Sequence, residues 1–195
     1  MDFDKLIRIR TNSLQPAKGR ILISEPFMGD YYFGRAVVLL AEHNEEGSFG
    51  LIMNKPAESS FNKIVQDFPP FEATVYLGGP VATDSLFFIH TVGNDIPESS
   101  EILPGLYWGG DMEVVREMII LGQLQPSKIR FYVGYSGWEA NQLEGELKRN
   151  TWLVSRETAG SLMKTKPSEM WQNYVQRMGS DYELWRRFPV DPQMN

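Results

Sequence analysis

Short apolar runs, each bounded by glycine, proline or acidic residues, make up the first half of the chain. Runs of this kind predict strands that are separated by turns. They cover residues 20–24, 36–41, 49–53, 75–77, 86–92 and 105–108. The run over 36–41 has no polar position, which is typical of a strand buried on both faces, and the turn at 45–47 predicts a hairpin with 49–53. Residues 93–104 are the longest polar stretch and are expected to be a connecting loop.

Helical periodicity interrupts these strands twice and dominates the end of the chain. The predicted helices cover residues 60–68, 112–121, 139–149, 167–178 and 183–187. Ser60 is the expected cap of the first, and Asp111 and Gly122 are the expected start and stop of the second. The last is expected to begin with a Ser180-x-x-Glu183 capping box. Strands are also predicted over 129–133 and 152–155, with a turn over 134–138. Because the helices are inserted singly or gathered at the end, the pattern favours an α+β fold with a mixed or antiparallel sheet.

Composition limits the classes of protein to which the chain can belong. A chain of 195 residues, 42% of them hydrophobic and 23% charged, is expected to form one compact domain. Its 19 Lys and Arg against 25 Asp and Glu residues give a net charge of −6, which disfavours binding to nucleic acid or anionic membranes. Residues 1–11 lack the apolar run of a signal peptide, and no run approaches the roughly 20 residues of a membrane span. We therefore expect a cytoplasmic protein.

The chain has no cysteine and two histidines. This composition excludes disulfides, thiolate nucleophiles, cysteine-ligated zinc and iron–sulfur clusters. Oxygen and imidazole groups remain as candidates for chemistry, and we expect no cofactor. A metal site could combine His43 and His90 with Glu42 or Asp111. The two histidines are not at ligand spacing on one element, so imidazoles that brace strands are favoured and no metal is expected.

Residues 134–138, Gly-Tyr-Ser-Gly-Trp, stand where hydrolases place the G-x-S-x-G turn that exposes a nucleophilic serine. The last glycine is replaced by tryptophan, and both histidines precede Ser136, which excludes the α/β-hydrolase order. A convergent triad of His43 or His90 with Asp111 and Ser136 stays open as an alternative. Because no base is local, the favoured interpretation is a tight turn in which glycine supplies a positive φ.

Two glycine-rich segments, 78–80 and 108–111, are similar in composition to phosphate-binding loops. Both lack the lysine and the glycine spacing of such loops. Asp111 would also place a negative charge where the anion would sit. We therefore expect tight turns between strands at both places.

Several motifs, taken in order, resemble the YqgE/AlgH family of bacterial proteins. They are residues 19–23 (GRILI), 35–40 (RAVVLL), 50–56 (GLIMNKP), 76–81 (YLGGPV), 109–111 (GGD), 134–138 (GYSGW) and 142–147 (QLEGEL). The resemblance covers about residues 19–155 and departs from the family pattern at Asp30-Tyr31-Tyr32-Phe33 and at Asn141. It implies an α+β fold of coiled sheets and no established activity, together with a transcription-regulator label that the net charge opposes.

Together, these observations predict an α+β protein formed by residues 1–195 as a single domain. Its mixed, coiled sheet or partial barrel is flanked by helices, with a family-like core over about 19–155 and a helical C-terminal extension over about 160–190. We expect a non-enzymatic module that binds a small ligand or a protein partner through polar strand ends. The expected binding residues are Arg35, Asn54, Gly79, Trp138 and Gln142. The alternatives are a hydrolase that uses Ser136 with a histidine, and a transcriptional regulator. Oligomeric state is left open.

Overall fold

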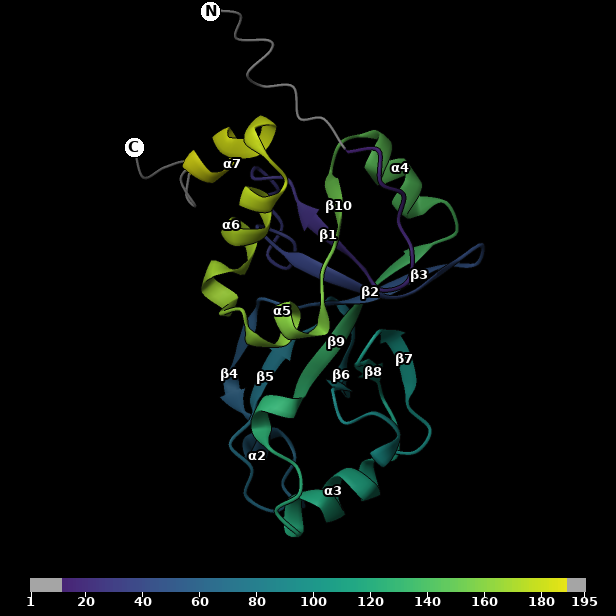
Figure 1. Ribbon diagram of the computed structural model, residues 1–195, viewed down its shortest axis with the longest axis vertical. Coiled ribbons are helices and arrows are strands. Elements are labelled where there is room, and N and C mark those ends of the chain that lie inside the picture. Colours follow the sequence, from purple (N-terminus) through teal and green to yellow (C-terminus); the bar gives the residue numbers. More distant parts are fainter. Residues whose placement is uncertain (1–11, 189–195) are drawn as a thin grey trace, which may run out of the picture.

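A computed structural model describes residues 12–188, which form an α+β fold around one ten-stranded sheet (Figure 1). The strands are β1 (Arg20–Ser24), β2 (Val37–Asn44), β3 (Gly47–Ile52), β4 (Pro56–Ser60), β5 (Thr74–Leu77), β6 (Val81–His90), β7 (Ser100–Leu103), β8 (Leu106–Trp108), β9 (Ile129–Glu139) and β10 (Trp152–Arg156). Their order is β10-β1-β2-β3-β9-β6-β8-β7, and β5 also pairs with β4 and β9. The sheet is mixed because β5 and β9 run parallel, whereas the other pairs are antiparallel.

Helices cover the sheet on several sides. They are α2 (Phe61–Ile64), α3 (Met112–Ile120), α4 (Gln142–Lys148), α5 (Ala159–Lys164), α6 (Pro167–Arg177) and α7 (Glu183–Arg187), with short 3₁₀ turns η1 (Gly93–Asp95), η2 (Pro126–Lys128) and η3 (Ser180–Tyr182). We call β1, β2, β3 and β10 with α4 to α7 the upper region, and β4 to β8 with α2 and α3 the lower region (Figure 1). In the described part of the chain, no helix combines the length and apolar character needed to cross a bilayer.

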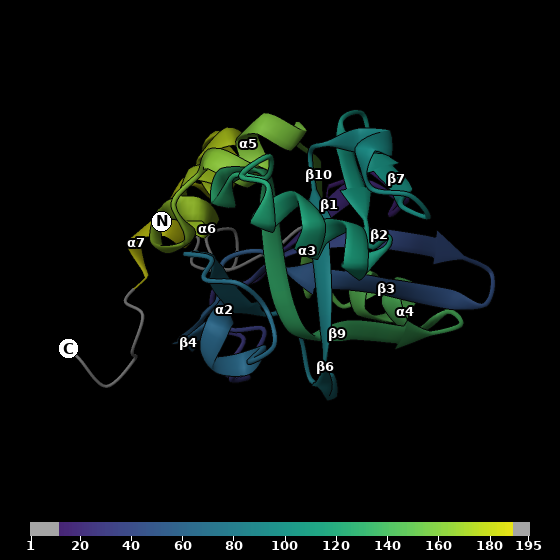
Figure 2. The ribbon, with the colours of Figure 1, turned by 90° about the horizontal axis from the view of Figure 1, so that it is seen from below.

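Strand β9 joins the two regions. Its first half, Ile129 to Val133, pairs with β5 and β6 in the lower region. Its second half, Ser136 to Glu139, pairs with β3 in the upper region. Figure 2 shows the β2–β3 hairpin and the end of β9 on the side of the molecule opposite α6 and α7. One strand therefore carries side chains into two different environments.

The upper region buries both faces of its strands. Along β2, Val37 and Leu39 belong to a core that includes side chains of α5 and α6, whereas Val38 and Leu40 belong to a second core that includes Leu143 of α4. Because successive side chains of a strand point to opposite faces, covering both faces requires the continuous apolar run seen in the sequence. A third core fills the lower region, where aromatic rings from β9, α2 and the segment before β5 pack together.

The structure confirms the predicted α+β class, the 20–24 strand, the β2–β3 hairpin and the Asp111-capped helix. The turn predicted over 134–138 is wrong, because β9 continues through it to Glu139. The loop predicted over 93–104 is partly wrong, because it contains β7.

The predicted caps at Ser60 and Ser180 are also wrong. No side-chain capping hydrogen bond forms at α2, and the turn after Ser180 begins as η3 rather than as a capped α-helix. The predicted 60–68 helix shortens to four residues, Phe61–Ile64. Its apolar side chains pack in the lower core, where a turn after Ile64 brings the ring of Phe68 against Phe61. Tertiary packing overrides the helical period there.

Candidate functional site

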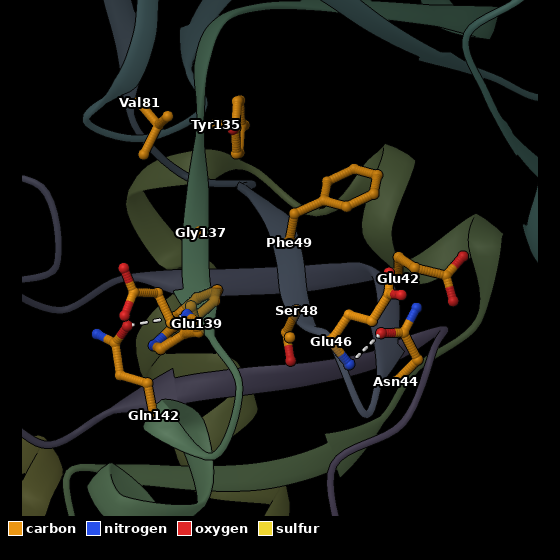
Figure 3. A pocket seen from close by; sticks show the side chains of 12 residues that line it. Glu42, Asn44, Glu46, Ser48, Phe49, Val81, Tyr135, Gly137, Glu139 and Gln142 are labelled. Carbon is orange, nitrogen blue, oxygen red and sulfur yellow. Dashed lines mark hydrogen bonds between the residues drawn. The ribbon is translucent and has the colours of Figure 1, made fainter.

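An open cavity of about 630 Å³ lies over the β2–β3 hairpin and the second half of β9. Its walls combine two kinds of residue, carboxylates and aromatic rings. The lining residues are Glu42, Asn44, Glu46, Gly47, Ser48, Phe49, Val81, Tyr135, Gly137, Trp138, Glu139 and Gln142. Figure 3 shows Glu139 and Gln142 on one side of the β3–β9 pair, Glu42, Asn44 and Glu46 on the other, and Phe49 and Tyr135 farther along the strands.

Aromatic side chains from both regions fix one wall of this cavity. The ring of Phe49 lies edge-on to Trp108 at a centroid distance of 5.1 Å and to Tyr135 at 6.0 Å. Phe87 stacks on Trp108 at 5.5 Å and meets Tyr135 edge-on at 5.7 Å. Edge-to-face and offset contacts at these distances are the favourable geometries for aromatic pairs. These contacts hold the rings of Phe49 and Tyr135 in the cavity wall.

The charges on the cavity wall are all negative. Glu42, Glu46 and Glu139 line it, and no lysine or arginine of the described residues does. Lys18 lies 3.8 Å from the Glu42 carboxylate at the rim. Among the described residues, the carboxylates of Glu46 and Glu139 have no hydrogen-bond or ion-pair partner, so they are available to a ligand. The site can attract cations and repel anions.

His43, one of the candidate catalytic residues, lies behind this rim. Its Nδ1 is 2.7 Å from the hydroxyl of Ser48, and its Nε2 is 3.7 Å from a carboxylate oxygen of Glu144. The imidazole thus links β2, β3 and α4. Its side chain is 18% exposed. These contacts connect the β2–β3 hairpin to α4, and the strand-bracing role of the imidazole stays a prediction.

Trp138 and Gln142, two predicted binding residues, belong to a hydrogen-bonded cluster centred on Glu146. The indole N–H groups of Trp138 and Trp152 both donate to Oε2 of Glu146, at 2.9 and 2.8 Å. The Gln142 amide donates to Oε1 of the same carboxylate at 3.1 Å and accepts the backbone N–H of Glu139 at 3.0 Å. Sequence reasoning missed Glu146. The spacing of Gln142 and Glu146, four residues apart on one helix, was the available signal.

A second cavity, of about 430 Å³, shares Gly137, Trp138 and Gln142 with the first. It is also lined by Phe33, Trp152 and Glu146 among other residues. The two predicted binding residues thus lie between two cavities, and their polar groups are oriented by the Glu146 carboxylate.

Arg35 and Asn54 lie together but away from this cavity. Asn54 accepts the backbone N–H of Val37 and donates to the carbonyl of Arg35, both at 2.9 Å. The Arg35 guanidinium lies 4.8 Å above the ring of Trp171 in α6 and donates to the carbonyl of Phe188. Burial lowers the pKa of Arg35. In this structure these contacts tie the carboxyl-terminal helices to the sheet, and no described contact of either residue reaches the cavity.

Gly79 acts through the absence of a side chain. A Cβ at this position would lie 2.3 Å from the backbone carbon of Tyr135. Its φ of +153° is also rarely adopted by residues with a side chain. The chain between β5 and β6 therefore presses directly on β9, beside the cavity wall.

Ser136, the candidate nucleophile, is fully buried, and its hydroxyl donates to the carbonyl of Gly78 at 3.0 Å. The predicted turn around it is absent because Gly134, at a φ of +70°, bends β9 without ending it. Strand pairing with β3 continues at once from Ser136. The hydroxyl is thus a structural group between two backbone segments.

His90 and Asp111 lie in the lower region. The fully buried His90 ring stacks on Tyr107 at 5.6 Å and donates from Nε2 to the carbonyl of Gly109 at 3.1 Å. Its Nδ1 is buried and has no hydrogen-bond partner among residues 12–188, and burial lowers the pKa of His90. Asp111 caps α3 by accepting the N–H of Glu113. Within residues 12–188, neither histidine bonds to Ser136, and no three His, Cys, Asp or Glu side chains are placed to hold a metal ion.

Comparisons with known proteins agree across almost the whole chain. A family model described as AlgH-like (DUF179) matches residues 21–183, which extends past the residues that carried the resemblance. A UPF0301 protein of Bacteroides thetaiotaomicron is 47% identical over 191 residues, covering 97% of each chain. A UPF0301 protein of Parabacteroides distasonis is 40% identical over 195 residues, covering 99% of this chain and 98% of its own. The names of these relatives state no activity.

Two solved structures share the fold. The solution structure of the AlgH protein from Pseudomonas aeruginosa is 32% identical, with a TM-score of 0.70, and covers 92% of this chain and 98% of its own. The crystal structure of a Corynebacterium diphtheriae protein has a TM-score of 0.76 at 20% identity and covers 91% and 95% of the two chains. The second likeness concerns the fold alone.

Proposed function

The chain belongs to the AlgH-like family, and on this premise we propose that it is a cytoplasmic, non-enzymatic protein that binds a cationic small molecule over β2, β3 and β9. The observation that carries the proposal is the lining of the 630 Å³ cavity, where three carboxylates accompany an aromatic wall and, among residues 12–188, no lysine or arginine belongs to the lining. Ligand cavities commonly have volumes of roughly 300–1,000 Å³, so this one suits a small organic ligand.

The carboxylates and the aromatic wall both favour binding of a cation. A cation near Glu46 and Glu139 gains Coulomb attraction, and an ammonium group over Phe49 or Tyr135 gains about 0.5–1 kcal/mol from the ring quadrupole at an exposed site. A phosphate backbone would be repelled by the same carboxylates. An amine with an alkyl chain fits both kinds of wall, whereas a nucleic acid would stack its bases on the aromatic rings but would be repelled by the carboxylates.

The experiment uses spermidine as the probe, because it carries several ammonium groups on a short alkyl chain. Calorimetric titration of the full chain at low ionic strength is expected to give saturable binding. The double substitution Glu46→Gln and Glu139→Gln is expected to weaken it by roughly three- to tenfold, because exposed ion pairs contribute about 0.2–1 kcal/mol each.

The matched control is Glu58→Gln with Glu117→Gln. Both carboxylates are exposed, on β4 and α3, and their removal changes the net charge by the same two units. This variant is expected to bind spermidine as the unmodified chain does. Absence of saturable binding, or an equal loss of affinity in the two double variants, would show that the cavity is not the site.

A further inference from the structure

A buried arginine in the first half of β9 lacks a carboxylate partner. Arg130 is 8% exposed. Its guanidinium donates to the carbonyl oxygens of Met53 at 3.3 Å and Met163 at 2.9 Å. Within residues 12–188, no carboxylate lies within the 4.0 Å of an ion pair with it. An arginine has five N–H donors, so these two hydrogen bonds leave donors for another acceptor.

The neighbours of this guanidinium are aromatic and carry no negative charge. Its central carbon lies 5.0 Å above the ring of Tyr76. The hydroxyl of Tyr132 donates to the sulfur of Met53 at 3.3 Å. Burial raises the pKa of Tyr132, so its phenol stays protonated and cannot neutralise the arginine. Carbonyl dipoles, a ring face and the neutral phenol of Tyr132 surround the guanidinium, and none of these groups supplies a negative charge that compensates it.

A cavity of about 210 Å³ lies against this arginine. Arg130 lines it together with Tyr76 and Met163, which are two of the residues that its guanidinium contacts. The cavity therefore borders the charged end of the side chain. The remaining lining residues are Glu72, Ala73, Thr74, Pro126, Ser127 and Ile129. Several of them are exposed, which gives a solute access from outside.

We propose that this cavity binds a small oxyanion, a carboxylate or phosphate group, through the guanidinium of Arg130. The planar fork of an arginine matches two oxygens of such a group, and the hydroxyls of Thr74 and Ser127 add neutral donors along the same wall. A volume of about 210 Å³ is below the roughly 300 Å³ of common ligand pockets, so the site holds the ionic group rather than a large molecule.

The negative charge of Glu72 repels an anion in this cavity, so removing this charge provides a test of the proposal. Its carboxylate is exposed and lines the same cavity without forming an ion pair with Arg130 among the described residues. Water screens this charge, so it weakens anion binding without abolishing it. Its removal is expected to strengthen binding without touching the core.

The site is separate from the acidic cavity over the hairpin. It shares no lining residue with that cavity and lies at the other end of β9. Met163 of α5 lines the smaller cavity, and its carbonyl accepts a hydrogen bond from Arg130. An anion there would strengthen the junction between α5, β5 and β9, so its binding should raise the thermal unfolding temperature.

The experiment follows backbone amide NMR signals of the isotopically labelled full chain during titration with inorganic phosphate, with acetate as a second arm and chloride as the ionic-strength control. Saturable shifts are expected at Thr74, Ser127 and Met163, with little change at Ser48 and Phe49. Stronger binding of phosphate than of acetate would identify a phosphate group as the preferred ligand, and the reverse would identify a carboxylate.

Two substitutions act in opposite directions. Glu72→Gln is expected to tighten anion binding by about two- to fivefold, because it removes an exposed like charge. Arg130→Lys is expected to weaken it by about tenfold, because an ammonium cannot present the planar fork. The unfolding temperature of each variant reports on its folding. If the shifts do not saturate, or if Glu72→Gln leaves the affinity of a folded protein unchanged, the proposal is wrong. This result would leave the spermidine test unaffected.

Discussion

The two halves of β9 differ in how they hold polar side chains. The lower half buries the charge of Arg130 among carbonyl groups and aromatic rings. The upper half leaves the Glu139 carboxylate at the surface and holds Trp138 through the Glu146 carboxylate of α4. One strand thus presents a cation at one end and an acidic cavity at the other. Both charged side chains belong to β9 itself, and the elements that pack against each half decide whether the charge is buried or exposed.

The largest expected effect comes from breaking the junction between the halves. Gly79→Ala would place a Cβ 2.3 Å from the Tyr135 backbone at a φ of +153°. We expect a loss of about 3 kcal/mol or more in the free energy of unfolding, because backbone must shift and the conformation is strained. Urea denaturation followed by tryptophan fluorescence measures this loss.

Gly122→Ala is the matched control for that substitution. Gly122 also has a positive φ, +68°, but a Cβ there meets no atom within 4 Å. We expect a cost of about 1 kcal/mol, from backbone conformation alone. Equal losses at the two glycines would mean that the close approach of the β5–β6 connection to β9 does not stabilise the fold.

A smaller loss is expected from Glu146→Gln in the upper half. Both indole N–H groups donate to Oε2 of Glu146 and the Gln142 amide donates to Oε1, so replacing one of these oxygens with an NH2 group leaves at least one of the three donors without its acceptor. We expect the free energy of unfolding to fall by about 1–3 kcal/mol. The neighbouring Glu144→Gln, at a carboxylate that is 41% exposed, should cost under about 0.5 kcal/mol. If both variants unfold at the same urea concentration, the cluster does not anchor α4.

The stability of the lower region is expected to depend on pH through His90 of β6. Burial lowers the pKa of His90 from the ordinary 6.5, so the unfolded chain binds a proton at this residue more tightly than the folded protein does. This residue therefore leaves stability unchanged above about pH 7 and lowers it as the pH falls through 6.5 toward the native pKa. Urea midpoints at pH 7.5 and 5.5 should differ less in His90→Gln than in the unmodified chain. An unchanged difference would show that His90 does not titrate this way.

The sequence predicted the strands of the upper region well because local patterns specify them. The run over 36–41 is apolar at every position, and its burial on both faces leaves no alternative to a central strand. The turn predicted over 134–138 failed for a non-local reason. Two glycines in five residues are typical of a turn, but β3 and β6 offer pairing partners on either side of the bend at Gly134.

The candidate site was predictable in part. Trp138 and Gln142 were identified from their motif and do line the cavity, although their role in binding stays a prediction. The sequence did not predict the carboxylates of the cavity wall. Glu46 and Glu139 are distant in sequence, and only the pairing of β3 with β9 places them around one cavity. The sequence did not single out Arg130 as a binding residue either, because its burial and the absence of a carboxylate partner within residues 12–188 can be seen only in the folded chain.

The smallest expected effect concerns the aromatic wall of the acidic cavity. Phe49→Leu keeps an apolar side chain but removes the ring face, so spermidine affinity should fall by about two- to fivefold, as for an exposed cation–π contact. Phe27→Leu is the control, because Phe27 is 53% exposed and its ring packs against Phe188 instead. Calorimetric titration of both variants measures the difference. If they bind spermidine equally, the carboxylates alone attract the cation, and the aromatic rings at this end of β9 serve packing, as those around Arg130 do.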